Sequence, residues 1–257
     1  MTKAAAGSPE NFNLEGQLAL VTGASRGLGE GCALALARAG AGVVLAARDR
    51  DGLMLVADKI EELGRTAHVL AVDVTNLETF AAALDDLPKV DIFINNAGTN
   101  RPQPFLDVDV DTYDDVTNLN VRAAFFAAQA VARKMVKEKT EGCIIHMSSQ
   151  AGHRALRDRS VYCSTKFALE GLNKTMAFEL AEHNIRVNAV APTFVETPMT
   201  RPSLDNQDFR DYVEGKIKLP RLGQVEDVAS AVVFLASPAA SMITGSSLLV
   251  DGGWTIH

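Results

Sequence analysis

Short apolar runs alternate with longer segments of helical periodicity along most of the chain. The runs are apolar throughout instead of alternating with polar residues, which is typical of strands that are covered on both faces. They lie at Gln17–Thr22, Val43–Ala47, Ala67–Val72, Val90–Ile94, Cys143–Met147, Ile185–Ala191 and Ser247–Val250. The segments between them predict helices that end at Ala39 or span Gly52–Leu63, Leu77–Leu87, about Asp111–Lys137, about Ser160–Glu182 and about Val225–Ala236.

This strict alternation of strands and helices predicts an α/β fold. Right-handed crossovers then place helices on both faces of a parallel sheet. We expect a Rossmann-type, doubly wound sheet of about seven strands. No repeat or linker divides the 257 residues. We therefore expect a flexible N-terminal lead over residues 1–13 and a single domain over residues 14–257.

Composition narrows the classes of partner. The net charge is −7 and the pI about 5.3, so the chain repels phosphate backbones and anionic lipids. No apolar run approaches the ~20 residues that a membrane-spanning helix needs. The three cysteines show no spacing of a metal site or disulfide framework. We expect a cytoplasmic protein with a small-molecule substrate, without metal, nucleic-acid or membrane partners.

A glycine-rich segment, TGASRGLG, joins the first predicted strand to the first predicted helix. Glycines allow a sharp turn and a close approach to a pyrophosphate, while free N–H groups at the helix start attract the anion. A glycine cluster alone also fits an ordinary tight turn, but its place between strand and helix favours dinucleotide binding. The candidate residues are Gly23, Ser25, Arg26, Gly27, Leu28 and Gly29.

The residues after the second strand bear on which dinucleotide binds. An acidic residue about 20 positions after the glycines usually holds the ribose of NAD, but Ala47 and Arg48 occupy this region. Arg26 and Arg48 could bracket a 2′-phosphate, because a guanidinium matches phosphate oxygens in paired hydrogen bonds. This pattern predicts that NADP(H) is preferred and NAD(H) possible. Alternatively, both arginines are surface charges and Asp49 binds the ribose.

Tyr162 and Lys166 are four residues apart on a predicted helix and so share one face. A nearby ammonium stabilises the phenolate and lowers a tyrosine pKa that is ordinarily about 10. Such pairs are common by chance. Here, however, Ser148–Ser149 and the segment 95–98 (NNAG) follow two predicted strands and reach the same sheet edge. We therefore predict that Tyr162 is an acid/base group.

From Leu14 to Trp254 the chain resembles the short-chain dehydrogenase/reductase family. The resemblance rests on TGASRGLG at 22–29, Asp73, NNAG at 95–98, Asn120, Ser149, YCSTK at 162–166 and VDGG at 250–253. It implies an NAD(P)-dependent oxidoreductase that transfers a hydride between the nicotinamide and a carbonyl or secondary alcohol.

The resemblance implies a role for each catalytic residue. Ser149 would hold the substrate oxygen. It is preferred over Ser148 because it lies 13 residues before Tyr162, which is the usual interval in the family. Tyr162 would exchange the proton on that oxygen, and Lys166 would hold the nicotinamide ribose and tune Tyr162. Asn120 would anchor a water molecule that connects Lys166 to solvent. Asn118 is a rival for this role, and Asn120 could instead be a helix residue bonded to a neighbouring carbonyl.

The resemblance also implies cofactor contacts beyond the glycine-rich turn. Asp73, followed by Val74, would accept from the adenine amino group, a role compatible with capping a helix. Asn95 would pack against the adenosine ribose, beside Ala97 and Gly98. Backbone groups at Val195 and the Thr197 side chain would bind the carboxamide. The chain departs from the family's Pro-Gly at Pro192 and Thr193, which adds a hydroxyl to the site.

Polar residues at the expected mouth of the site predict a sugar, polyol or hydroxy acid as substrate. They are Arg101, Gln150, His153, Arg154, Thr193 and Glu196. Alternatively, these residues are polar or charged only because loops lie in solvent.

The chain resembles gluconate 5-dehydrogenase-like family members. The alternative is 3-oxoacyl-carrier-protein reductase-like members, which Arg154, Arg157 and Arg159 keep open. A third and more remote alternative is a non-catalytic scaffold protein that senses a dinucleotide.

The same resemblance implies a homotetramer, or a homodimer, through the two long helices. Phe125 and Phe126 add apolar surface beyond what one sheet face needs, unless they only pack on the sheet.

Overall fold

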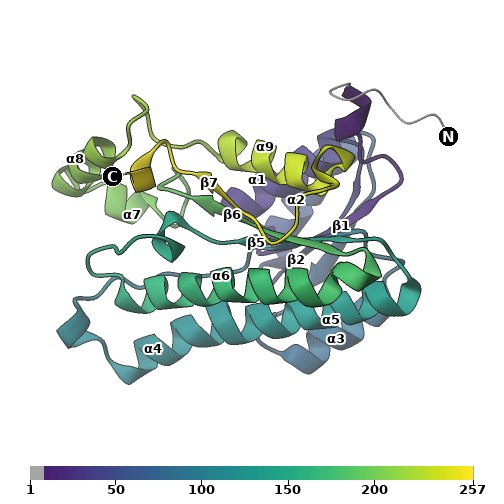
Figure 1. Ribbon diagram of the computed structural model, residues 1–257, viewed down its shortest axis with the longest axis horizontal. Helices are drawn as coiled ribbons and strands as arrows, with labels where there is room; N and C mark the ends of the chain where they lie inside the picture. The colour runs from purple at the N-terminus through teal and green to yellow at the C-terminus, as the bar shows by residue number, and fades with distance from the viewer. Residues whose placement is uncertain (1–8, 257) are drawn as a thin grey trace.

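Seven parallel strands form one sheet in the order β3-β2-β1-β4-β5-β6-β7 (Figure 1). The structure is a computed structural model that describes residues 9–256. The strands are β1 (Leu18–Thr22), β2 (Gly42–Ala47), β3 (Ala67–Ala71), β4 (Ile92–Asn95), β5 (Cys143–Met147), β6 (Arg186–Pro192) and β7 (Ser247–Val250). All seven predicted strands are present, and the doubly wound parallel fold is confirmed.

The central strands are apolar because helices cover both of their faces. Every residue of β4 and β5 is buried, including His146. The edge strands β3 and β7 are only partly buried, so the expectation of two covered faces does not hold for them. An edge strand lies at the margin of the helix layers and has a neighbouring strand on one side only.

Two helix layers enclose the sheet (Figure 1). The first layer contains α1 (Gly27–Arg38), α2 (Arg50–Glu62) and α9 (Val225–Ala236), whose apolar side chains form one core with the sheet. The second contains α3 (Leu77–Asp85), α4 (Val110–Thr117), α5 (Ala124–Glu138) and α6 (Ser160–Leu180), and side chains of α3, α5 and α6 form the other core with the sheet. Within the described residues, no helix is both long and apolar enough to cross a membrane.

The helix predicted over about Asp111–Lys137 is not regular throughout. A π-helical stretch, Asn118–Ala123, joins α4 to α5. Wide turns of this kind are rare and occur often at functional sites. Here the stretch carries Asn120.

Two helices were not predicted: α7 (Arg201–Leu204) and α8 (Gln207–Lys216). They contact Trp254 through a small third core that includes Leu204, Val213 and Phe209. Phe194 stacks on both Phe209 and Trp254, with ring centroids 5.5 and 5.6 Å apart. This core joins α8 to the C-terminal segment.

The predicted flexible lead, residues 1–13, lies partly outside the described residues, which begin at position 9. Pro9–Phe12 forms one 3-10 turn, and the Phe12 ring lies 6.4 Å from that of Phe234 on α9. Leu14, the predicted start of the domain, is fully buried.

Candidate active site

The carboxyl ends of β1, β4, β5 and β6 lie at one edge of the sheet, where strand order reverses between β1 and β4. Ligands of open α/β sheets bind at such a switch point. The Thr22 hydroxyl accepts from the backbone N–H groups of Asn96 and Ala97 at 3.0 and 3.1 Å. These bonds connect the start of the glycine-rich turn to the NNAG segment.

The glycine-rich turn has a shape that only small residues allow. A Cβ at Gly29 would lie 2.1 Å from the Gly23 carbonyl oxygen, and Gly23 and Gly27 have φ of 66° and 61°. Arg26, at the N-cap of α1, bonds none of the first helical N–H groups through its side chain. The first N–H groups of α1 are therefore left for a ligand. The turn thus fits the pyrophosphate of a dinucleotide.

Residues after β2 leave a positive edge beside this turn. The Asp49 carboxylate accepts from Gly52 N at 3.0 Å and caps α2. It is therefore engaged within the protein. Arg48 is exposed and lies 3.8 Å from Asp73. Arg26 is exposed too and has no ion pair in the part of the chain that the structure describes. The two predicted phosphate-binding arginines are available to a ligand.

Asp73 lies just beyond β3, beside the buried Val74. Burial raises the pKa of its carboxyl, but two hydrogen bonds from Thr75 and the charge of Arg48 outweigh burial and lower it. The helix cap that Asp73 could have provided comes from Asn76, whose Oδ1 accepts from Thr79 N at 3.2 Å. Asp73 therefore remains ionised at this edge of the sheet.

Asn95 is placed differently from the expectation that it packs against adenosine. Its side chain is buried, and Nδ2 donates to Ala124 O at 2.8 Å and lies 3.2 Å from His146 Nδ1. Asn96 is the residue beside the glycine-rich turn, donating to Thr22 O at 2.9 Å. Asn95 is the last residue of β4 and Asn96 follows it, and the two adjacent side chains contact different parts of the protein.

Tyr162, Lys166 and Ser149 meet at the end of β5. The Lys166 ammonium lies 5.4 Å from the centre of the Tyr162 ring and donates to the Met147 carbonyl at 2.8 Å. The Ser149 side chain lowers the pKa of the Tyr162 hydroxyl, and the Ser149 hydroxyl donates to Gln150 Oε1 at 2.7 Å. The predicted tyrosine, lysine and serine are brought together.

The ionisation of this group differs in one respect from the sequence expectation. Burial raises the pKa of Tyr162 to about 12, against a smaller lowering by the Ser149 side chain. Burial lowers the pKa of Lys166 to about 8, against a raising effect of Glu170. Burial therefore outweighs the expected lowering of the tyrosine pKa. At neutral pH the tyrosine carries its proton and the lysine its charge.

Asn120 connects the NNAG loop to α6. Its Oδ1 accepts from Thr99 N, and its Nδ2 donates to Thr99 O, both at 2.8 Å. The Nδ2 group also lies 3.2 Å from Thr165 Oγ1. The side chain is 1% exposed. Asn118, its rival, precedes it in the same π-helical stretch.

A family model described as enoyl-(acyl carrier protein) reductase matches residues 23–255, which contain this whole arrangement. The chain belongs to the short-chain dehydrogenase/reductase family. It is 41% identical over 249 residues to an L-xylulose reductase of Mesocricetus auratus, covering 96% of this chain and 99% of that one.

Two solved structures of short-chain dehydrogenases/reductases show the same fold. One, from Mycobacterium marinum, is 40% identical with a TM-score of 0.92, and the match covers 97% of this chain and 100% of that chain. The other, a gluconate 5-dehydrogenase from Burkholderia cenocepacia in complex with NADP and tartrate, is 33% identical with a TM-score of 0.93. It covers 97% of this chain and 99% of that chain.

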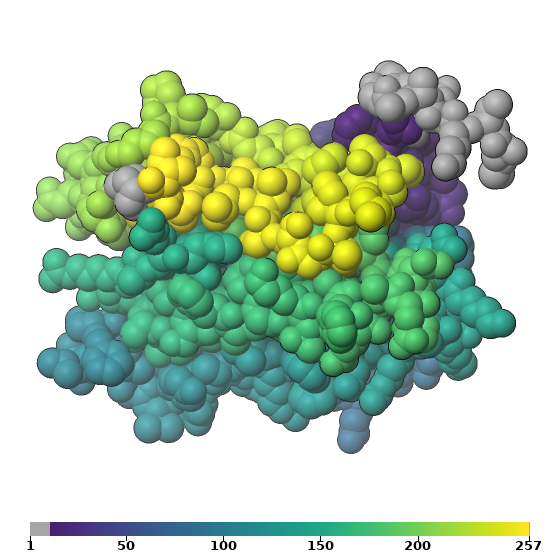
Figure 2. Space-filling model, in the orientation of Figure 1, coloured from purple at the N-terminus to yellow at the C-terminus, as the bar shows by residue number. Residues whose placement is uncertain are grey.

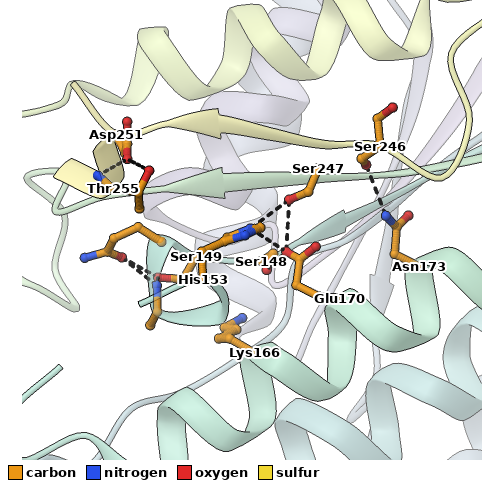
Figure 3. Close-up of polar contacts among 12 residues, drawn as sticks. Ser148, Ser149, His153, Lys166, Glu170, Asn173, Ser246, Ser247, Asp251 and Thr255 are labelled. Atoms are coloured by element: carbon orange, nitrogen blue, oxygen red, sulfur yellow. Dashed lines mark hydrogen bonds and ion pairs between the residues drawn. The ribbon is translucent and has the colours of Figure 1, made fainter. Parts of the chain in front are cut away.

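Three residues predicted to contact the substrate of this short-chain dehydrogenase/reductase have protein partners instead. His153 Nε2 lies 3.0 Å from Ser247 Oγ and 3.2 Å from a carboxylate oxygen of Glu170 (Figure 3). Arg154 donates to Thr255 O at 3.0 Å. Arg101 pairs with Asp115 at 2.7 Å. Their contact with a substrate stays a prediction.

Two of the other residues predicted at the mouth of the site, Gln150 and Thr193, have polar atoms without a partner among the described residues. Gln150 is 2% exposed, and its Nε2 has no hydrogen-bond partner among residues 9–256. The same holds for the buried Thr193 Oγ1, although the Thr193 backbone N donates to Val250 O at 3.1 Å. Unpaired buried polar groups are costly unless a ligand satisfies them.

The segment after β6 closes over the glycine-rich turn. A Cβ at Gly27 would lie 3.6 Å from Thr197 Cβ, so this segment borders the dinucleotide site. Val195 is buried and pairs with Gly223. Thr197 Oγ1 lies 3.2 Å from Thr200 Oγ1. The contacts of Pro192, Val195 and Thr197 with the cofactor stay a prediction.

Sequence reasoning missed Glu170, which is buried one helical turn beyond Lys166. Its carboxylate accepts from Ser148 at 2.5 Å and from Ser247 at 3.0 Å (Figure 3). Glu170 therefore joins α6 to the serine loop and to β7. Its four-residue spacing from Lys166 was the signal that could have drawn attention to it.

Proposed function

We propose that this protein is an NADP(H)-dependent oxidoreductase that interconverts a carbonyl and a secondary alcohol of a polar, hydroxylated substrate. The observation that carries the proposal is the meeting of Tyr162, Ser149 and Lys166 beside a dinucleotide-shaped glycine turn. We assign Tyr162 as acid/base, Ser149 as substrate-oxygen ligand, and Lys166 and Asn120 as supporting residues.

In the reduction direction, the bound nicotinamide supplies a hydride to the carbonyl carbon. Tyr162 gives its proton to the carbonyl oxygen, so the alcohol gains one hydrogen at carbon and one at oxygen. The Ser149 hydroxyl donates a hydrogen bond to the same oxygen and stabilises its developing negative charge. Lys166 orients the ribose and stabilises the phenolate that remains until solvent returns a proton.

The preference for NADP(H) rests on Arg48 and Arg26. Both are exposed at the dinucleotide edge, while the competing Asp49 carboxylate caps α2. The B. cenocepacia relative was solved with NADP. Ser25, Leu28, Asp73, Val74, Ala97 and Gly98 complete the proposed cofactor site. Asn95 has other partners and would support this site only indirectly.

A polar substrate is favoured by the unpartnered atoms of Gln150 and Thr193 at the catalytic edge. The relatives named above carry the names of L-xylulose and gluconate, both of which are polyhydroxylated. An aliphatic thioester would leave these polar groups unsatisfied. We therefore place sugars, polyols and hydroxy acids ahead of acyl thioesters.

The alternative, reduction of 3-oxoacyl groups on an acidic carrier protein, needs a basic surface near the cleft. Of the three arginines considered for this, Arg154 is bonded to Thr255 and Arg159 is buried. The Arg157 side chain is 92% exposed, but its Nε lies 3.9 Å from the Asp158 carboxylate. This arrangement favours the polar small molecule.

A substrate panel tests the proposal. Keto-sugars, keto-sugar acids and acetoacetyl thioester would each be offered with NADPH and with NADH, and cofactor oxidation followed by absorbance. We expect turnover of a polyhydroxylated ketone with NADPH. Turnover of the thioester alone would establish the alternative, and no turnover at all would favour the non-catalytic scaffold.

We propose a homotetramer, with a homodimer as the smaller possibility, and a cytoplasmic location. The helices α5 and α6 present large apolar side chains to solvent, namely Phe125, Phe126, Phe167 and Phe178. In the view of Figure 2, α6 lies open along the face between the C-terminal segment and the helices α4 and α5. Exposed apolar faces of this kind mark association surfaces. The three free cysteines suit a reducing compartment.

A further inference from the structure

Arg159 is a buried arginine at the mouth of the catalytic site. It is the last residue before α6 and lies three positions before Tyr162. Only 7% of it is exposed, and its Cζ lies 5.6 Å from the centre of the Phe209 ring on α8. Its backbone pairs with Gln103, in the loop that follows NNAG. The guanidinium thus packs against α8, and the Arg159 backbone pairs with the loop that follows NNAG.

The guanidinium has no counter-ion among the described residues. Its one hydrogen bond within them runs from Nη1 to the Asp158 carbonyl at 3.3 Å. The Asp158 carboxylate instead lies 3.9 Å from Arg157. Burial lowers the pKa of Arg159, against opposing effects of Asp158, Cys163 and Tyr162. A buried cation without a partner is unfavourable, so an anion that reaches it binds with a large gain.

The free side of the guanidinium is the side that matches a carboxylate. Nε is buried without a partner, and Nη2 forms no hydrogen bond within residues 9–256. These two nitrogens point in one direction and can donate two parallel hydrogen bonds. Arg159 also acts electrostatically on Tyr162, which places its charge near the proton donor.

We propose that Arg159 binds the carboxylate of the substrate, which makes the substrate a keto acid and the product the corresponding hydroxy acid. This inference rests on the proposed function and narrows it from polar carbonyls in general to anionic ones. The Nε and Nη2 groups of Arg159 bind the carboxylate end of the substrate, while Ser149 and Tyr162 bind its carbonyl oxygen. A neutral ketose leaves the guanidinium unpaired.

The test compares 5-keto-D-gluconate with its primary amide, which has the same shape without the charge. We expect the wild-type enzyme to show at least a tenfold higher kcat/KM for the acid, as the loss of a charged hydrogen-bond partner implies. In Arg159→Gln this acid-over-amide ratio falls to about one, and in Arg159→Lys it is partly retained. Arg157→Gln, an exposed neighbour with the same change of charge, leaves the ratio unchanged.

A purely structural Arg159 gives a different outcome. If it only supports Phe209, Arg159→Gln lowers kcat/KM for acid and amide by the same factor, and the inference is overturned. The inference also fails if the wild type prefers the amide or neutral ketoses, although the proposed function then stands.

A binding measurement keeps the two proposals separate. Tartrate would be titrated calorimetrically into the enzyme with NADP⁺ bound. We expect Arg159→Gln to weaken tartrate about tenfold or more and Arg157→Gln to leave it unchanged. Equal affinities in wild type and Arg159→Gln would overturn the inference. Absence of turnover with every carbonyl compound would sink the proposed function, while this titration would still decide whether Arg159 binds a carboxylate.

Discussion

At the scale of single residues, burial shifts the pKa values of the two groups in the proposed catalytic pair in opposite directions. It raises the pKa of Tyr162 to about 12 and lowers that of Lys166 to about 8. The Lys166 ammonium lies 5.4 Å from the centre of the Tyr162 ring, whose hydroxyl still carries its proton. In this state Tyr162 can donate a proton. The site at neutral pH therefore suits reduction of a carbonyl.

Charge reversal at Arg48 tests the cofactor preference at the same scale. Arg48→Asp replaces a cation by an anion at the proposed 2′-phosphate and restores a carboxylate for a ribose. We expect NADPH to bind at least tenfold more weakly, on the order of the loss of one charged hydrogen bond. The affinity for NADH should change less than threefold. Titration of both cofactors by fluorescence measures this.

Arg38→Asp, at the far end of α1, is the matched control and should affect neither cofactor. Equal losses of NADPH and NADH in Arg48→Asp would show that Arg48 does not contact the 2′-phosphate.

At the scale of elements, Glu170 holds three parts of the fold together: α6, the serine loop and β7. Its carboxylate lies within hydrogen-bond distance of Ser148, Ser247 and His153 (Figure 3). Its negative charge also raises the pKa of Lys166. Glu170 therefore links α6, which carries Tyr162, to β7 at the edge of the sheet.

Glu170→Gln separates the charge from the hydrogen bonds. Without the carboxylate, the pKa of Lys166 falls further, so its ammonium loses its proton at a lower pH. In the wild type we expect reduction to decline as pH rises through about 8. In Glu170→Gln the decline should begin at lower pH, with the rate on the acidic side little changed. The pH dependence of kcat measures both.

The exposed Glu179→Gln, on the same helix, makes the same change of charge and should leave the profile in place. A uniform fall of kcat at every pH in Glu170→Gln would mean that Glu170 only stabilises the fold.

Elements differed in how well the sequence predicted them. The strands were predictable because the continuous apolar runs of a parallel sheet differ from helical periodicity. The helices α7 and α8 were not, since they are short and are held by aromatic contacts with Trp254 rather than by a repeating pattern. Likewise, the partner of His153 is Ser247, 94 residues away, which no local pattern indicates.

At the scale of the whole molecule, the apolar faces of α5 and α6 bear on assembly. Phe178 is 86% exposed in the single chain, which is costly for a side chain of this size. Phe178→Asp should shift a tetramer to smaller species in sedimentation equilibrium. Leu55→Asp, on the exposed face of α2, should leave the mass unchanged. A wild-type chain that sediments as a monomer would contradict the proposed assembly.

The site was predictable where its residues have a characteristic spacing in the sequence. It was not predictable where their placement depends on tertiary contacts. Tyr162, Lys166 and the glycine turn have local spacing that indicates their roles. Asn95 and Asn96 are adjacent and chemically identical, and only the strand geometry decides which one contacts the glycine turn. The lack of an ion pair at Arg159 among the described residues is likewise a property of the fold.

The most direct test of the central claim is Tyr162→Phe, which removes the phenolic proton and leaves the ring. Cofactor oxidation with the best carbonyl substrate and binding of NADPH would be measured side by side, with Tyr113→Phe on α4 as the matched control. We predict that turnover falls by about a thousandfold, the scale of general-acid catalysis, while NADPH affinity stays within about twofold. Turnover that survives in Tyr162→Phe would show that the carbonyl oxygen receives its proton from a group other than Tyr162.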